Sequence, residues 1–221
     1  MIGRLLHFAP YPILTVPVKG LTRPPASTVE PVPERAIRLG GTGRRALAAQ
    51  EAGGQHPRMA AISFEAVPID KPEDSNVLVG QAHFIKTVED LHEALASAGP
   101  HLRFGLAFCE ASGPCLVRRS GNDEALIALA ADDALAIGAG HSFVALLRGA
   151  FPVAVLNSLK LVPEVCTVFC ATANPVDVLV AVTPRGRGVI GVVDGSPPVG
   201  IETPTDAAER HALLRTIGYK L

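Results

Sequence analysis

The sequence lacks tryptophan, and aromatic residues make up only 5% of its 221 residues. It also lacks any apolar run of the roughly 18 residues that a membrane-spanning helix requires. Neither common phosphate-binding motif occurs: there is no Gly-x-x-x-x-Gly-Lys-Ser/Thr, and no Gly-x-Gly-x-x-Gly after a first strand. These absences argue against a membrane-spanning protein, a P-loop enzyme and a dinucleotide-fold enzyme. Because 48% of the residues are hydrophobic, the chain can still bury a large core, and we expect a soluble protein.

Cysteine is scarce as well. The four cysteines, Cys109, Cys115, Cys166 and Cys170, lack the short paired spacing of a zinc site and lie in apolar, strand-like stretches. We therefore expect reduced, buried thiols and no metal site. Prolines interrupt the apolar stretch at 5–18 and no small-residue cleavage site follows it, so a secretory signal is not predicted. A reducing, cytoplasmic location is the consistent expectation.

The N-terminal quarter differs from the rest of the chain. Residues 1–58 carry eight Lys and Arg against three Asp and Glu, together with eight of the 19 prolines, and show no sustained apolar period. This composition predicts a disordered extension, and Met59 is a candidate for the true start of translation. A basic arm that binds an acidic partner is the functional alternative. The remaining residues, 59–221, have an acidic balance, which together with the few aromatics argues against a nucleic-acid partner.

From Met59 onward, apolar segments alternate with turn residues. Thr87, with Asp90 three residues on, predicts one helix start, and Asn122 predicts another. The pattern indicates one α/β domain in which a mixed β-sheet packs against about four helices. The expected strands are 62–69, 76–80, 102–110, 115–118, 142–148, 165–172, 176–183 and 189–194, and the expected helices are 88–98, 123–137, 152–161 and 206–217.

The most informative local feature is the loop Gly138-Ala139-Gly140-His141-Ser142, which follows a long apolar helix. Glycines let backbone N–H groups approach a phosphate, and histidine supplies a nucleophile or proton carrier near neutral pH. His141 is therefore a candidate phosphoryl carrier, or else a hydrogen-bonded core histidine. His83 and Lys86 stand before the helix start at Thr87, where a histidine, a cation and a helix N-terminus could receive an anion together.

Other polar residues stand where apolar segments end. Glu110 could act as a general base or bind a ribose hydroxyl, or it could be merely exposed. Cys109 is a poor nucleophile, because apolar surroundings raise the pKa of a thiol. Asn122 could cap a helix or contact ribose or a metal. Asn174 could form a turn or read a base edge, and Asp194 could form a turn or bind magnesium.

Several longer motifs then carry a resemblance. Segments 80–91, 104–113, 138–143, 169–175 and 217–221 resemble the adenosine-specific kinase family of archaea and bacteria, and the match covers essentially all of 59–221. The resemblance implies binding of adenosine and AMP, a histidine able to carry a phosphoryl group, and assembly as a trimer. Two departures are residues 1–58, which have no counterpart, and Ala82, where a serine is expected.

The resulting prediction is an adenosine-specific phosphotransferase that acts through a phosphohistidine. A non-catalytic adenosine or AMP sensor is the alternative, and a hydrolase that uses Cys109 is a weaker third reading. No motif identifies the phosphoryl donor; ATP with Mg²⁺ is the ordinary example. We do not expect a membrane partner. Arg185 and Arg187 could meet phosphates, although a solvated hairpin tip is the preferred interpretation. The predicted catalytic residues are His141, His83 and Glu110, and the predicted ligand-binding residues are Lys86, Thr87, Cys109, Asn122, Gly138, Gly140, Ser142, Asn174 and Asp194.

Overall fold

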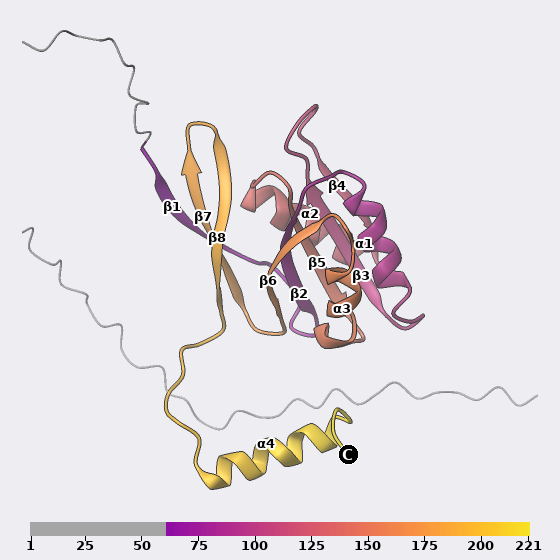
Figure 1. Cartoon of the computed structure of the whole chain (residues 1–221), viewed down its shortest axis with the longest axis vertical. Coiled ribbons are helices and arrows are strands. Elements are labelled where there is room, and N and C mark those ends of the chain that lie inside the picture. The colour runs from indigo at the N-terminus through magenta and orange to yellow at the C-terminus, as the bar shows by residue number, and fades with distance from the viewer. Residues whose placement is uncertain (1–60) are drawn as a thin grey trace, which may run out of the picture. The chain divides into compact units, whose positions relative to one another are not determined.

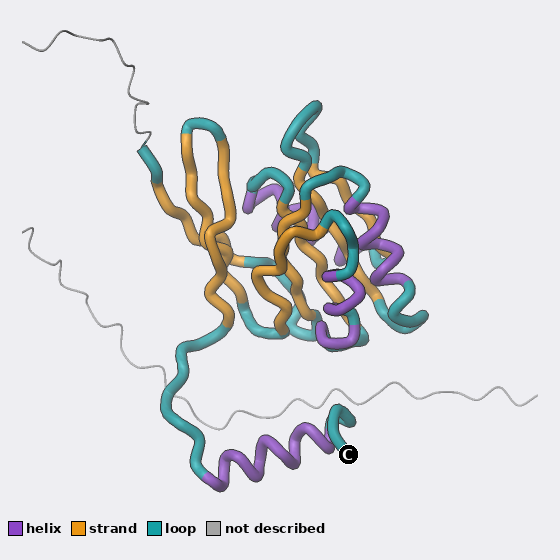
Figure 2. Tube along the Cα trace, in the orientation of Figure 1, coloured by secondary structure: helices purple, strands orange, loops and turns teal. Residues whose placement is uncertain are grey.

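The computed structural model describes residues 61–221, so the predictions for 1–58 lie outside the described residues. Its strands form two sheets, with the orders β1-β7-β8 and β4-β3-β5-β2-β6 (Figures 1 and 2). The strands are β1 (Ser63–Pro68), β2 (Asn76–Ala82), β3 (Arg103–Cys109), β4 (Val117–Gly121), β5 (Ser142–Arg148), β6 (Val165–Thr172), β7 (Val176–Thr183) and β8 (Gly186–Asp194), and the helices are α1 (Thr87–Ala96), α2 (Glu124–Ile137), the short 3-10 helix η1 (Pro152–Ala154), α3 (Leu156–Lys160) and α4 (Pro204–Thr216).

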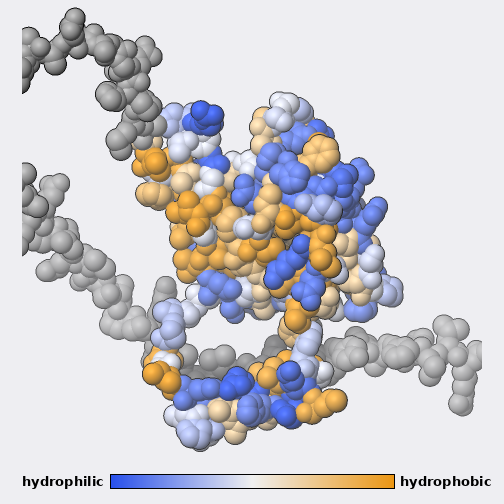
Figure 3. Space-filling model, viewed as in Figure 1, coloured by the Kyte–Doolittle hydropathy of each residue, from blue (hydrophilic) through white to orange (hydrophobic). Residues whose placement is uncertain are grey.

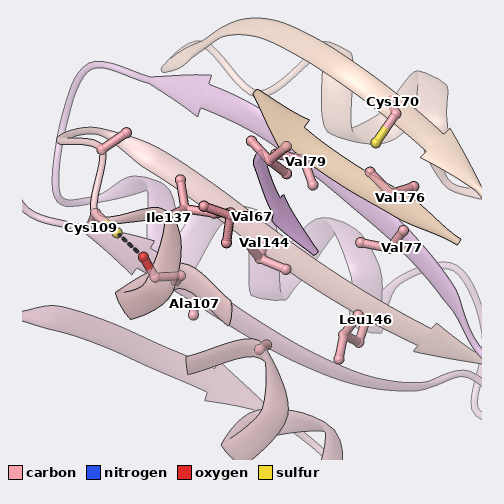
Figure 4. Close-up of a cluster of buried hydrophobic side chains, with 14 of the residues drawn as sticks. Val67, Val77, Val79, Ala107, Cys109, Ile137, Val144, Leu146, Cys170 and Val176 are labelled. Atoms are coloured by element: carbon pink, nitrogen blue, oxygen red, sulfur yellow. Dashed lines mark hydrogen bonds between the residues drawn. The ribbon is translucent and has the colours of Figure 1, made fainter. Parts of the chain in front are cut away.

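The five-stranded sheet is covered on both faces, which explains why its central strands are apolar at nearly every position. Alternate side chains of β2 point to opposite faces, so Val77 and Val79 join one core cluster and Leu78 joins the other. Helix α2 and strand β7 pack in the first cluster, part of which is drawn in Figure 4. Helices α1 and α3 pack in the second, around Phe104, Phe108 and other buried rings.

The predicted α/β class is confirmed, but the strands do not form one mixed sheet. Every pairing between the named strands of the described part is antiparallel. Strands β7 and β8 are joined by a tight turn, which permits only antiparallel pairing, and β1 adds to the far side of β7. The alternation of strands and helices in the sequence could not reveal which strands become neighbours.

Two predicted helix starts need correction. Asp123, rather than Asn122, caps α2, because its side chain accepts hydrogen bonds from the N–H groups of Ala125 and Leu126. Thr87 does not cap α1: it is the first residue of the helix, is buried, and donates its hydroxyl to the carbonyl of Phe84. Lys86 precedes Thr87 at the start of α1 and forms no side-chain cap, so α1 begins without one.

Smaller differences concern element boundaries. The strand expected at 115–118 begins at Val117, and the one expected at 189–194 begins at Gly186. The helix expected at 152–161 divides into η1 and α3. None of the helices in the described range 61–221 has the length and apolar character needed to cross a membrane.

Candidate functional site

One end of the five-stranded sheet collects most of the predicted site residues. The antiparallel order places the last residues of β2 and β3 beside the first residues of β4, β5 and β6. Two backbone hydrogen bonds fasten the junction: the N–H of Ala82 donates to the carbonyl of His141 at 2.9 Å, and the N–H of His141 donates to the carbonyl of Cys109 at 2.7 Å. We call this end of the sheet the histidine end. It holds His83, Lys86, Thr87, Cys109, Glu110, Gly138, Gly140, His141 and Ser142.

His141 has a left-handed backbone conformation, with φ at +64°. Such a φ is uncommon for a residue with a side chain, and strained backbone of this kind concentrates at functional sites. The half-buried imidazole stacks on Phe108, with ring centroids 5.9 Å apart and an interplanar angle of 19°. The preceding Gly140 is needed for a close approach, since a Cβ there would lie 2.9 Å from the Cβ of Ala111. These features fix the ring against the end of β3.

The backbone donors of the 138–142 loop are largely used within the fold. The N–H of Gly138 donates to the carbonyl of Ala134 at 2.9 Å, and that of Ser142 donates to the carbonyl of Ala139 at 3.1 Å. The Ser142 hydroxyl donates to the same carbonyl at 2.7 Å. A parallel bridge between Ala139 and Arg187 engages the loop further. In this conformation the loop therefore offers an anion few of the main-chain donors that the glycines led us to expect.

Glu110 is held by three donors. Its carboxylate accepts from the N–H of Leu116 at 2.9 Å and from Nε and a terminal nitrogen of Arg118, each at 2.7 Å. The backbone hydrogen bond from Leu116, followed by the contact with Arg118, holds the pKa of Glu110 below its ordinary value. A carboxylate with a depressed pKa is a weak general base at neutral pH. Its oxygens remain suitable acceptors for a ligand hydroxyl.

A second ion-pair group involves a residue that the sequence reasoning missed. Glu164, just before β6, is 4% exposed, and one of its carboxylate oxygens lies 2.5 Å from the ammonium of Lys86. Its backbone carbonyl accepts the N–H of His83 at 3.1 Å. The hydrogen bonds that the Lys86 ammonium donates to Asp90 and then to Glu164 raise the pKa of Lys86. Glu164 thus anchors the segment that carries the exposed His83. Because Glu164 lies 78 residues after Lys86 in the sequence, no local pattern could predict that the two side chains pair.

The start of α1 does not present free donors for an anion. The N–H of Thr87 donates to the carbonyl of Phe84, and the N–H groups of Glu89 and Asp90 both donate to that of Lys86. Lys86 and Arg118 line an open cleft of about 750 Å³, but both cations already face carboxylates. This arrangement weakens the prediction that the helix start and Lys86 together receive a phosphate.

The thiol of Cys109 faces the core. It is 6% exposed and donates to the carbonyl of Ala134 at 3.3 Å, the dashed contact in Figure 4. Burial raises its pKa, which disfavours the nucleophilic thiolate. Cys170 is buried as well, whereas Cys115 and Cys166 are exposed, so the expectation of buried thiols holds for only two of the four.

Three predicted ligand residues lie at the opposite end of the sheet. The side chain of Asn122 accepts from the N–H of Phe104 at 2.8 Å and donates to the carbonyl of Leu102 at 2.9 Å. Asn174 donates to the carboxylate of Asp194 at 2.9 Å, beside the end of β6. The structure therefore does not bring these three side chains to the histidine end.

A cleft of about 690 Å³ opens beside the histidine end, between the two sheets. Cys109, Glu110, Gly138 and Gly140 line one side, and the β7–β8 hairpin lines the other. The two hairpin arginines have different roles. Arg187 donates to the carbonyls of Ile137 and Ala136 at the end of α2 and pairs with Glu65 at 2.9 Å, so it is not a solvated tip. Arg185 lines the cleft and is exposed, and it forms no ion pair with any residue of 61–221.

Within residues 61–221, no three His, Cys, Asp or Glu side chains come close enough together to form a metal centre. The histidine end and its cleft offer two imidazoles, two carboxylates held by cations, and Arg185.

Comparison with known proteins agrees with this architecture. The family model described as adenosine specific kinase matches residues 67–220. The crystal structure of the PH1918 protein from Pyrococcus horikoshii OT3 is similar to this chain, with 48% sequence identity and a TM-score of 0.71. The similarity covers 73% of this chain and 99% of that chain. A comparison with curated proteins gave no match. On the strength of the family match and the structural likeness, the chain belongs to the adenosine-specific kinase family.

Proposed function

We propose that this protein binds adenosine and AMP at the histidine end and transfers a phosphoryl group to adenosine through His141. The family match over 67–220 carries the proposal. The strained backbone and half-buried ring of His141 support it, because a phosphoryl group on nitrogen needs shelter from water. His83 is exposed by comparison and suits ligand contact better than storage of a phosphoryl group.

The transfer divides into two displacements. In the first, a neutral imidazole nitrogen of His141 bonds to the terminal phosphorus of a nucleoside triphosphate while the bond from phosphorus to the bridging oxygen breaks, which releases the diphosphate. In the second, the 5′-hydroxyl oxygen of adenosine attacks the phosphorus from the side opposite the N–P bond, that bond breaks to return the neutral imidazole, and the hydroxyl proton is released to solvent. Solvent takes the proton in place of Glu110, because a carboxylate with a depressed pKa is a weak general base.

The cleft lined by Gly140, the residue directly before His141, is the proposed nucleoside site, although the ring of His141 is not part of its lining. Its volume of about 690 Å³ falls in the range of small-molecule pockets, roughly 300–1,000 Å³. The half-exposed side chains of Leu116, Leu135 and Ile190 give it an apolar lining that suits a purine base. Glu110 can accept a ribose hydroxyl, and Arg185 can meet a single phosphate at the rim. We propose binding of adenosine and AMP there, with ATP held less well.

A non-catalytic adenosine or AMP sensor is the second candidate. The observation that favours it is the state of the neighbouring groups: Glu110 and Lys86 are engaged in ion pairs, and the thiol of Cys109 is buried with a raised pKa. A binding module requires only the cleft, whereas turnover requires that a phosphoryl donor also reach His141. The buried thiol argues against the cysteine hydrolase.

One labelling experiment separates the candidates. The full chain is incubated with [γ-³²P]ATP and adenosine, and both acid-labile protein label and AMP are measured. The phosphotransferase predicts label on wild-type protein and production of AMP, and the loss of both in His141→Ala. The matched control, His101→Ala, changes an exposed histidine outside the histidine end and should behave as wild type. Label without AMP would favour the sensor, and phosphate located on His83 by mass spectrometry would reverse the roles of the two histidines.

The resemblance also leads us to propose a cytoplasmic protein that assembles as a homotrimer. Light scattering of the full chain tests the assembly: a trimer has three times the 23.0 kDa mass of one chain.

A further inference from the structure

The last 27 residues, which follow β8, form a segment that we call the arm (195–221). Helix α4 within it is well capped: Thr203 and Asp206 form a reciprocal capping box, Pro204 occupies the first turn, and Glu202 pairs with Arg210 at 2.9 Å. Nevertheless, no residue of α4 is buried. Because an isolated helix of this length is only marginally stable in water, its apolar side chains need a packing partner.

The connector and the end of the arm show the same excess of exposed apolar side chains. Val199 is 98% exposed, Ile201 97% and Leu213 50%. Within the chain the arm contacts the body at its first residue, where the N–H of Gly195 donates to the carbonyl of Pro175 at 3.0 Å, and near its end, where the ring of Tyr219 meets Phe151 edge-on at 5.8 Å. Those contacts leave the exposed apolar residues Val199, Ile201 and Leu213 uncovered.

The three-stranded sheet carries an uncovered apolar surface of its own. Among the described residues, β1 and β8 are its edge strands, each with one strand neighbour. Phe64 of β1 is 69% exposed, and Val193 of β8 is 47% exposed. Figure 3 shows hydrophobic residues gathered over this region. An exposed apolar patch on open edge strands is usually covered by a partner.

We propose that the arm of one copy packs on the β1–β7–β8 sheet of a second copy. Each chain contains both an arm without a packing partner and a sheet surface without a cover, so reciprocal exchange satisfies both in a closed, symmetric assembly. A different protein bound to the arm would leave the sheet surface exposed, and one bound to the sheet would leave the arm exposed. The arm also has the right size, since a stable interface takes roughly 20–30 residues from each side. The family match runs to residue 220, so the arm is part of the domain that the family shares.

This inference rests on the proposed assembly of several copies and specifies its contact; it does not depend on the adenosine chemistry. A chain that binds adenosine but stays monomeric would overturn both the trimer and the arm exchange and leave the adenosine chemistry standing, whereas an arm variant that keeps the wild-type mass would overturn the arm exchange alone.

The test measures the mass of the full chain by size-exclusion chromatography with light scattering. The arm variant Ile201→Glu/Leu213→Glu and the sheet variant Phe64→Glu should each fall to the 23.0 kDa monomer while wild type is a multiple of it. The matched control, Thr205→Glu/His211→Glu, adds the same two charges at exposed polar positions of α4 and should keep the wild-type mass. All four positions in the arm are exposed within one chain, so far-UV circular dichroism should show the fold intact.

Mixing gives a second, independent readout. The arm variant keeps an unmodified sheet surface, and the sheet variant keeps an unmodified arm. In a mixture, the arm of the sheet variant can therefore pack on the sheet of the arm variant, so the two should form a complex that neither forms alone. A monomeric wild type, an arm variant that keeps the wild-type mass, or a mixture that stays monomeric would each overturn the proposal.

Discussion

Asp133 on α2 should make the stability of this protein depend on pH, and its replacement by asparagine should remove that dependence. The side chain is 3% exposed and lies in the core beside the β1–β2 connection. One carboxylate oxygen accepts the N–H of Asp70 at 2.9 Å, and the other is buried without a hydrogen-bond partner among the described residues. Burial raises the pKa of Asp133 from its ordinary value of 3.8 to about 7.

The direction of the pH dependence follows from whether the folded or the unfolded state binds the proton more tightly. Between pH 4 and 7 the folded protein keeps Asp133 protonated while the unfolded chain ionises it, so the free energy of unfolding falls as the pH rises. A shift of about three pKa units corresponds to roughly 4 kcal/mol, and relaxation around the charge makes that an upper bound. Asparagine keeps an acceptor for the Asp70 N–H and carries no charge. At pH 8 we expect Asp133→Asn to be about 2–4 kcal/mol more stable than wild type.

Urea denaturation between pH 4 and pH 8.5, at fixed protein concentration, measures this difference. The two proteins should converge near pH 4 and diverge as the pH passes 7. Asp132→Asn is the matched control, because Asp132 is the exposed neighbour on the same helix and its loss removes the same charge. The reasoning fails if Asp133→Asn is less stable than wild type at pH 8, or if both proteins show the same slope against pH.

Three further outcomes are expected. His141→Gly should be about 1 kcal/mol more stable than His141→Ala in thermal melts, because only glycine relieves the left-handed backbone; equal stability would contradict the strain. Arg187→Ala should destabilise by about 1–2 kcal/mol in urea, since Arg187 holds the carbonyls at the end of α2, whereas Arg185→Ala should leave stability unchanged. Adenosine and AMP should raise the melting temperature more than equal concentrations of ATP, and an equal or larger rise with ATP would contradict the proposed cleft.

The sequence was a good guide where local pattern decides the structure. The apolar runs predicted at 142–148, 165–172 and 176–183 are the strands β5, β6 and β7, and the family resemblance is confirmed. It was a poor guide where the outcome depends on which segments meet. Asn122 and Asp123 are both good helix caps, and only the proximity of the β3 backbone assigns Asn122 to the strand. The division into two sheets has the same origin.

The same contrast between local pattern and long-range contact applies to the candidate site. The glycine-histidine loop was visible as a local motif, and the structure brings it next to His83 and Glu110. The partners that set the chemistry of these residues come from elsewhere in the chain. Glu164 reaches Lys86 across 78 positions, and Arg187 reaches the end of α2 across 50. No local periodicity encodes such pairs, so an engaged Lys86 and a capping Arg187 could not be anticipated.

The hydrogen bonds of the 138–142 loop limit how a phosphate can be held. A phosphate bound by the N–H of His141 or Ser142 would first displace the carbonyl of Cys109 or Ala139, which those groups now contact at 2.7 and 3.1 Å. Each exchange costs about 1 kcal/mol before any gain from the anion. Contacts between the cleft and a purine base could offset that cost, whereas inorganic phosphate makes no such contacts. Phosphate alone should therefore bind much more weakly than AMP, and calorimetry that finds comparable affinities would show that the loop donors are free in solution.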